Sequence, residues 1–223
     1  MAAPATSSNI TTLIFVLTIN NVLRDMKEGF QAICSNCGLK WVMVTEVLIT
    51  FFIMPVVALI PLMTLKNFSG TAYQVSLIEL LFGSGALVGG ILLGIWNPRI
   101  RKVVMINISY IIIGVSIFVS GILPPSAFII YAIFAIVQGI SMPFYSGPFT
   151  ALLQTQIEVS FLGRVFSLFD SISLLPSILG LLATGFIADA IGIANVFVIC
   201  GIAIVITGTL AFFIPSIMNL EKK

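Results

Sequence analysis

Six long apolar segments constrain this chain more than any other feature of its sequence. Each is about 20 residues long or longer, which is the length that a helix needs to cross a hydrocarbon layer of roughly 30 Å. Irregular backbone is not tolerated against lipid, so each segment is expected to be a helix. The expected helices cover residues 41–65, 73–96, 103–123, 126–145, 164–188 and 193–214.

The composition agrees with a chain that lies mostly in lipid. Hydrophobic residues make up 59% of the 223 residues, charged residues make up 8%, and the mean hydropathy is +1.20. A soluble domain contains about 25% charged residues, so this chain has too few charges to cover a surface that faces water. The expected fold class is an all-α membrane protein.

Several function classes find no support in the sequence. The net charge of +2 is too small to indicate nucleic acid binding. Histidine is absent and the three cysteines cannot complete a four-ligand zinc site, so we predict no metal and no cofactor. No phosphate-binding loop and no hydrolase or protease motif occurs, so we expect no enzyme. Any transport would then depend on an ion gradient or be passive.

The basic residues lie mostly on one side of the expected membrane spans. Of the 10 lysines and arginines, all except Lys66 fall in residues 1–40, in the loops after the second and fourth helices, or at the C-terminus. Positively charged loops stay in the cytoplasm. We therefore predict a multi-pass plasma membrane protein whose N-terminal linker and C-terminus are both cytoplasmic, which six crossings allow.

The chain divides into three parts. Residues 1–40 combine a short apolar segment with an amphipathic cytoplasmic linker, and two readings of the apolar segment, a membrane helix or an interfacial segment, stay open. Residues 41–217 form the six-helix transmembrane bundle. Residues 218–223 form a cytoplasmic tail.

The bundle carries signs of an internal repeat of three helices. Glycine follows a glycine-rich helix at Gly94 and again at Gly185, in each case shortly before the next helix. Helices that are three apart run in opposite directions across the membrane, which is the pattern of an inverted repeat. We therefore expect a 3+3 inverted repeat, an arrangement that transporters use for alternating access.

Three stretches of the sequence resemble a known family. Residues 25–30 and 38–39 resemble the central cytoplasmic loop that precedes the seventh helix of bacterial drug efflux permeases of the macrolide-efflux type. Residues 90–94, with the basic residues that follow, resemble the family's glycine-rich helix and basic loop, and residues 162–168 resemble its "RGRVFSL" entry into the eleventh helix. Over residues 23–217 the chain thus resembles the C-terminal half of a Major Facilitator Superfamily transporter.

The resemblance implies half of a twelve-helix major facilitator fold that takes part in proton-coupled efflux of amphipathic drugs such as macrolides, by alternating access. The partners that it implies are the lipid bilayer, a small amphipathic drug, a proton, and a second six-helix half or a homodimer mate. Two positions depart from the family pattern, since Pro98 replaces the usual Asp and Leu162 the usual first Arg of the third motif. The alternatives are a truncated or scaffold membrane protein without transport activity and, more remotely, an intramembrane enzyme.

Acidic residues inside the expected helices are the candidates for proton coupling: Glu46, Glu79 and Asp170. A charge at the centre of a membrane helix costs about 2.5–3.5 kcal/mol on insertion scales, so such a residue is rarely incidental. The resemblance implies a carboxylate that takes up a proton on one side of the membrane and releases it on the other. The competing reading is that each side chain lies near a helix end and reaches the interface.

A second set of residues is expected to act in gating at the cytoplasmic loops. By resemblance, the basic residues would tie helix ends together in one state of the gate. The glycines would give smooth helix faces that can slide, although close helix packing explains them equally. The competing reading is that the positive charges only hold the loops in the cytoplasm. The set contains Gly90, Gly94, Arg99, Arg101, Lys102, Gly163 and Arg164.

Polar, aromatic and methionine side chains on the third and fourth expected helices suit a mostly apolar pocket for an amphipathic drug. The competing reading is ordinary helix packing, with a tyrosine at the membrane interface. The candidates for this substrate pocket are Asn107, Gln138, Met142, Phe144 and Tyr145.

Overall fold

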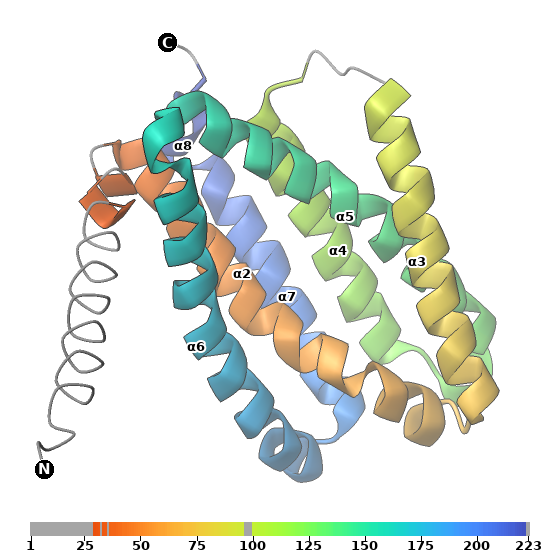
Figure 1. Ribbon diagram of the computed structural model, residues 1–223. Helices are drawn as coiled ribbons and strands as arrows, with labels where there is room; N and C mark the ends of the chain where they lie inside the picture. The colour runs from red at the N-terminus through yellow and green to blue at the C-terminus, as the bar shows by residue number, and fades with distance from the viewer. Residues whose placement is uncertain (1–28, 32, 35, 96–99, 222–223) are drawn as a thin grey trace, which may run out of the picture.

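A computed structural model of the chain describes residues 29–31, 33–34, 36–95 and 100–221, and within them it is helical without any strand (Figure 1). The long helices of this part are α2 (Cys37–Leu62), α3 (Ala72–Ile95), α4 (Lys102–Ile122), α5 (Phe128–Gln156), α6 (Val159–Ile191) and α7 (Ile193–Phe212). Shorter elements are the π-helical turn η1 (Met63–Asn67), the 3-10 turn η2 (Pro125–Ala127) and α8 (Pro215–Met218). The expected all-α fold is thereby confirmed.

Six helices of the described chain are long and apolar enough to cross a membrane. The expectation of six membrane helices is therefore confirmed, and the chain is a multi-pass membrane protein. The apolar stretch at residues 10–19 and most of the expected amphipathic helix at residues 23–33 lie outside the described residues. The division into linker, bundle and tail stays a prediction.

Helix ends differ from those that the apolar pattern predicts. The pattern places the end of the fourth span near Tyr145, but α5 continues through Pro143 and Pro148 to Gln156. A proline removes one backbone hydrogen bond and bends a helix, and neighbouring membrane helices can compensate for that loss. α6 begins at Val159, before the expected start at Arg164. The apolar pattern marks the part of a helix that lies in lipid, and the helical backbone can begin before it.

The start of α2 is set by a capping residue that precedes the apolar run. The side chain of Asn36 accepts a hydrogen bond from the backbone N–H of Gly38, over 3.1 Å. Such an N-cap satisfies one of the free N–H groups of the first turn. α2 therefore begins at Cys37 instead of the expected Trp41.

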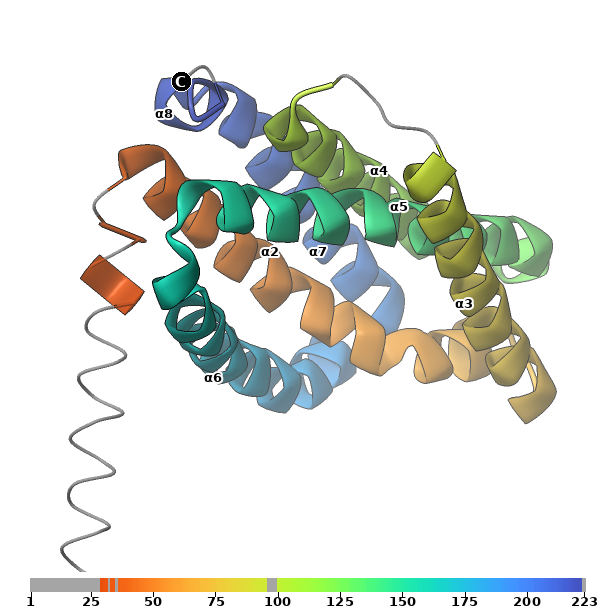
Figure 2. The ribbon, with the colours of Figure 1, turned by 45° about the horizontal axis from the view of Figure 1, so that its top comes forward.

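The packing of the helices is preserved when the first three helices are exchanged with the last three. α3 packs along α5 as α6 packs along α2, and α4 packs on α5 as α7 packs on α2. α4 and α7 pack against each other. α3 and α6 lie on opposite sides of the bundle in both ribbon views (Figures 1 and 2). This pattern fits the expected 3+3 repeat, in which α2, α3 and α4 correspond to α5, α6 and α7.

Glycines bring two pairs of helices into backbone contact. A side chain at Gly139 of α5 would collide with the carbonyl oxygen of Phe82 on α3. A Cβ atom at Gly201 of α7 would lie 2.5 Å from the backbone nitrogen of Phe118 on α4. Small residues allow membrane helices to approach in this way. The α3–α5 and α4–α7 contacts therefore depend on the absence of a side chain at these positions.

Candidate functional site

Glu46 is the acidic residue that the fold buries. It lies on α2, roughly 13 Å along the helix from its first residue at 1.5 Å per residue, and only 7% of its surface is exposed. It borders a cavity of about 10 Å³, here called the small cavity, between α2, α4 and α8. The small cavity is lined by Val42, Thr45, Glu46, Val103, Ile106, Asn107, Tyr110 and Ile217.

Two neighbours of Glu46 in the small cavity bury polar atoms without a hydrogen-bond partner among the described residues. These atoms are Nδ2 of Asn107 and the hydroxyl oxygen of Tyr110. By contrast, the hydroxyl of Thr45 donates a hydrogen bond to the Trp41 carbonyl over 2.8 Å. An unpaired buried polar group costs about 1–3 kcal/mol, so the small cavity favours a polar occupant. Its volume corresponds to about one water molecule.

The charge of Glu46 has no basic counterpart in the described part of the chain. The ion pair found there joins Lys102 to Glu221 at 3.9 Å, and Glu46 takes part in none. Tyr145 on α5 lies within electrostatic range of the Glu46 carboxylate. A buried carboxylate without a cation is costly in a membrane, so protonation is the simplest way to relieve the cost.

Tyr145 links the small cavity to a second, larger one. Its ring centroid lies 5.3 Å from that of Tyr110, and the two rings are inclined by 39°. Tyr110 borders the small cavity, whereas Tyr145 borders the larger one. The two tyrosines therefore join the two cavities through one ring contact.

The larger cavity, here called the large cavity, has a volume of about 370 Å³ and lies between α2, α3, α4 and α5. Its walls are mostly aliphatic and aromatic, and its polar groups come from Glu79, Gln138 and Tyr145. A cavity of this size with few polar groups is typical of a site for a small amphipathic molecule. Of the residues expected in coupling or in the pocket, the large cavity brings together Glu79, Gln138, Met142 and Tyr145.

Two expected pocket residues lie elsewhere. Asn107 borders the small cavity beside Glu46. Phe144 lines a separate groove between α4 and α5 together with Ser109 and Ser141. Successive residues of an α-helix point about 100° apart, so Phe144 and Tyr145 face different surroundings.

The three acidic candidates do not converge on one site. Glu79 is exposed on α3 at the large cavity. Asp170 is exposed on α6 and lines a groove with Thr50 and Met54 of α2. Glu46 is the one acidic residue among them that the fold encloses.

The basic gating candidates of α4 contact the C-terminal segment. Arg101 donates a hydrogen bond from Nη1 to the Met218 carbonyl over 3.5 Å, and Lys102 pairs with Glu221. Glu221 also accepts a hydrogen bond of 3.3 Å from the backbone N–H of Val103. These contacts tie the start of α4 to the end of the described chain.

The other gating candidates show few contacts that define a role. The guanidinium of Arg164 lies over the ring of Phe161, 5.6 Å from its centroid. A Cβ at Gly90, Gly94 or Gly163 would meet open space among the described residues. Arg99 lies outside the described residues.

Tyr110 is a residue of this site that the sequence patterns did not single out. It follows Asn107 by three residues, which places both on the same face of α4. A tyrosine and an asparagine on one face of an otherwise apolar membrane helix would have been the signal. The partner helix that carries Glu46 becomes apparent only in the fold.

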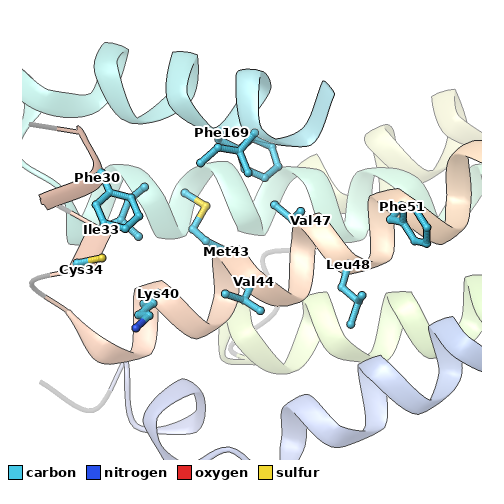
Figure 3. Close-up of a pocket in the computed structure, with 11 residues that line it drawn as sticks. Phe30, Ile33, Cys34, Lys40, Met43, Val44, Val47, Leu48, Phe51 and Phe169 are labelled. Carbon is cyan, nitrogen blue, oxygen red and sulfur yellow. The ribbon is translucent and has the colours of Figure 1, made fainter. Parts of the chain in front are cut away.

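A further groove, of about 460 Å³, is almost entirely apolar (Figure 3). Phe30 and Ile33 line one end, Met43 and Val47 of α2 form the floor, and Phe169 of α6 lies opposite. The charged side chain among its lining residues is Lys40. With so little polar chemistry, this groove is a weaker candidate for a selective site than the large cavity.

Comparisons with known proteins agree with this geometry. The model of the family described as Major Facilitator Superfamily matches residues 42–221. Macrolide efflux protein A of Streptococcus pyogenes is 37% identical to this chain over 203 residues, which cover 91% of the chain and 50% of that protein. Macrolide efflux protein A of Enterococcus faecalis is 40% identical over 161 residues, or 72% of the chain and 50% of that protein.

A more distant relative carries a broader name. Multidrug efflux pump Tap of Mycobacterium tuberculosis is 28% identical over 139 residues, which cover 61% of this chain and 32% of that protein. The chain spans about half the length of the macrolide efflux proteins that it matches.

Proposed function

Because this chain belongs to the Major Facilitator Superfamily, we propose that it is one half of a secondary active transporter that exports amphipathic drugs, macrolides among them. The family is one of transporters, which points away from an enzyme. Export is driven by proton antiport and proceeds by alternating access. The observation that carries this proposal is the burial of Glu46 beside a small polar cavity and without a basic partner among the described residues.

Glu46 is the proton carrier in this proposal. In the ionised form its charge interacts with buried polar groups alone, which is costly at membrane depth. A proton removes that cost, and a change of access to the other side of the membrane would allow the proton to leave. Glu46 lies on α2, which also contributes Ile53 and Val57 to the large cavity. One helix therefore carries both the proton site and part of the drug site.

The large cavity is the drug site in this proposal. Its apolar walls suit the hydrophobic body of an amphipathic drug, and Met142 can adapt to different shapes. Glu79 and Gln138 supply polar contacts, and the carboxylate of Glu79 favours drugs that carry an amine. The proposed substrate class is therefore an amphipathic cation.

The complete transporter contains six further helices, from a separate half or from a second copy of this chain. Two helices expose long apolar faces that a mate or lipid would cover. They are α3, with Leu87, Ile91 and Ile95, and α6, with Leu174, Leu179 and Leu182. In the plasma membrane, the start of α4 and the C-terminal segment face the cytoplasm, as the basic residues Arg101 and Lys102 favour.

A transport assay tests this proposal. The chain is reconstituted in vesicles with the first half of a macrolide efflux relative, and uptake of radiolabelled erythromycin is followed under an imposed pH gradient. Uptake driven by the gradient should be lost in Glu46→Gln, because the amide cannot carry a proton. It should persist in Asp170→Asn, which changes an exposed carboxylate of α6. Full gradient-driven uptake by Glu46→Gln would remove Glu46 from the mechanism.

A second candidate function is a truncated membrane protein that folds but transports nothing. The observation in its favour is that the chain spans about half the length of its macrolide efflux relatives. The same vesicles distinguish the two. No uptake above protein-free vesicles, with or without the added half, would favour the truncated protein.

A further inference from the structure

We propose that Tyr145 is a positioning residue through which the protonation of Glu46 changes the affinity of the large cavity for drug. This inference rests on the proposed function, since it takes Glu46 as the proton carrier and the large cavity as the drug site. To that function it adds one residue, Tyr145, that connects the proton site at Glu46 with the drug site in the large cavity.

The first support is the position of Tyr145 between the two sites. Its ring borders the large cavity, and its ring centroid lies 5.3 Å from that of Tyr110, which borders the small cavity. It also lies within electrostatic range of Glu46. Among the described residues, no other side chain both lines the large cavity and interacts with the Glu46 carboxylate.

The second support is the backbone that carries Tyr145. α5 contains Pro143 and Pro148, which flank the tyrosine on both sides. Each proline lacks an N–H group, so the carbonyls of Gly139 and Phe144 lose their usual helical partners. The short segment between the prolines can therefore bend more easily than a regular helix.

The stretches of α5 on either side of this segment are held by their neighbours. Gly139 places the backbone of α5 against Phe82 of α3. Beyond Pro148, Leu152 and Leu153 are fully buried, and Gln156 donates a hydrogen bond from Nε2 to the Leu220 carbonyl over 3.4 Å. A small movement is thereby confined to the segment that carries Tyr145.

The charge state of Glu46 supplies the force for such a movement. An ionised carboxylate accepts hydrogen bonds more strongly than a protonated one, so it attracts the hydroxyl groups of nearby tyrosines. Protonation weakens that attraction and leaves Tyr145 free to reorient in the wall of the large cavity. The two sites are then energetically coupled. By reciprocity, drug binding in the large cavity changes the proton affinity of Glu46.

Other titratable groups on the elements around α2 are accounted for. α4 contributes Tyr110 to the small cavity, and its Lys102 pairs with Glu221. On α6, Asp170 lines another groove and Arg164 lies over Phe161. α7 and α8 carry no charged residue, and Cys200 is the one thiol of α7. Lys40 of α2, Lys66 of η1 and Asp189 of α6 are exposed, and none of them borders the small cavity. The titratable neighbours of Glu46 are therefore Tyr110, in the same cavity, and Tyr145, which lies within electrostatic range.

A binding experiment tests the proposal. The chain is placed in lipid nanodiscs with the first half of a macrolide efflux relative, and its affinity for radiolabelled erythromycin is measured at an acidic and at a mildly alkaline pH. The ratio of the two affinities is the readout, because a simple loss of a drug contact affects both values alike. In the wild-type chain we expect a change of at least about fivefold, the lower end of ordinary coupling between sites.

The variants separate this inference from the proposed function. Tyr145→Phe keeps the ring, and we expect its affinity ratio to fall close to that of Glu46→Gln, which should be near unity. Tyr131→Phe is the matched control, because Tyr131 is also a tyrosine of α5, but it stacks on Phe68 and borders neither the small nor the large cavity. Its ratio should equal that of the wild type.

Three outcomes would contradict the role of Tyr145, and one of them would also contradict the proposed function. A wild-type affinity that does not change with pH contradicts the proposed function and this inference together. A wild-type ratio that persists in Tyr145→Phe but is lost in Glu46→Gln contradicts this inference alone. Loss of the ratio in Tyr131→Phe as well would make the effect a general one of tyrosine hydroxyls in α5 and would also overturn it.

Discussion

Glu46 and Glu79 are both carboxylates on membrane helices, yet their surroundings give them different chemistry. Glu46 is enclosed with Asn107 and Tyr110, whereas Glu79 is exposed at the wall of the large cavity. Burial makes the charge of Glu46 costly and its protonation useful. At the wall of the large cavity, Glu79 is placed to attract a cationic group of a bound drug. A proton carrier and a drug contact are thus assigned to different residues.

The role of Glu79 leads to a prediction about drug charge. An exposed ion pair contributes up to about 1 kcal/mol, which corresponds to about fivefold in affinity. Glu79→Gln should therefore weaken the binding of erythromycin, which carries an amine, by up to about fivefold. Binding of an uncharged apolar dye should stay the same. Equilibrium binding to the chain in nanodiscs measures both, and an equal loss for drug and dye would contradict the assignment.

At the scale of single elements, α5 reaches from the large cavity to the C-terminal segment. It packs against α3 through Gly139, carries Gln138 and Tyr145 into the large cavity, and ends at Gln156 near the C-terminal segment. Asn36, which caps α2, donates a hydrogen bond to Gln156 over 3.3 Å. α5 therefore spans from the large cavity to the junction of α2 with the C-terminal segment.

The α3–α5 contact leads to a prediction about stability. Gly139→Ala would place a methyl group against the backbone of Phe82, which cannot move as a flexible side chain can. Overpacking of this kind costs about 1–3 kcal/mol. Gly90→Ala on α3 is the matched control, since its Cβ meets open space among the described residues. Alanine is the better helix former, by about 1 kcal/mol, so this control should be neutral or stabilising.

Unfolding in detergent mixtures measures both variants against the wild type. Equal stability of Gly139→Ala and Gly90→Ala would contradict the close approach of α3 and α5.

The elements differ in how well the sequence predicts them. Apolar length alone predicts the six membrane helices, because a helix is the form that lipid permits. It misses the continuation of α5 through Pro143 and Pro148, because neighbouring helices compensate for the lost hydrogen bonds. Glu46 is predictable as a rare carboxylate in an apolar segment. The contact of Tyr110 with Tyr145 is not, because it depends on the packing of α4 against α5.

At the scale of the whole molecule, the chain is a bundle of two similar sets of three helices. The sets are held together by α4 with α7, and each outer helix, α3 or α6, packs on the first helix of the other set. The chain spans about half the length of its macrolide efflux relatives, and it exposes apolar faces on α3 and α6. We propose that a mate of six helices faces this bundle, and that the two move against each other during transport.

In the proposed function, Glu46 holds the proton that drug binding displaces. The most direct measurement is the release of protons when erythromycin binds to the purified chain in lightly buffered nanodiscs, followed with a pH-sensitive dye. We expect proton release by the wild-type chain and by Asp170→Asn, and none by Glu46→Gln at a drug concentration that saturates the site. Undiminished proton release by Glu46→Gln would contradict this role of Glu46.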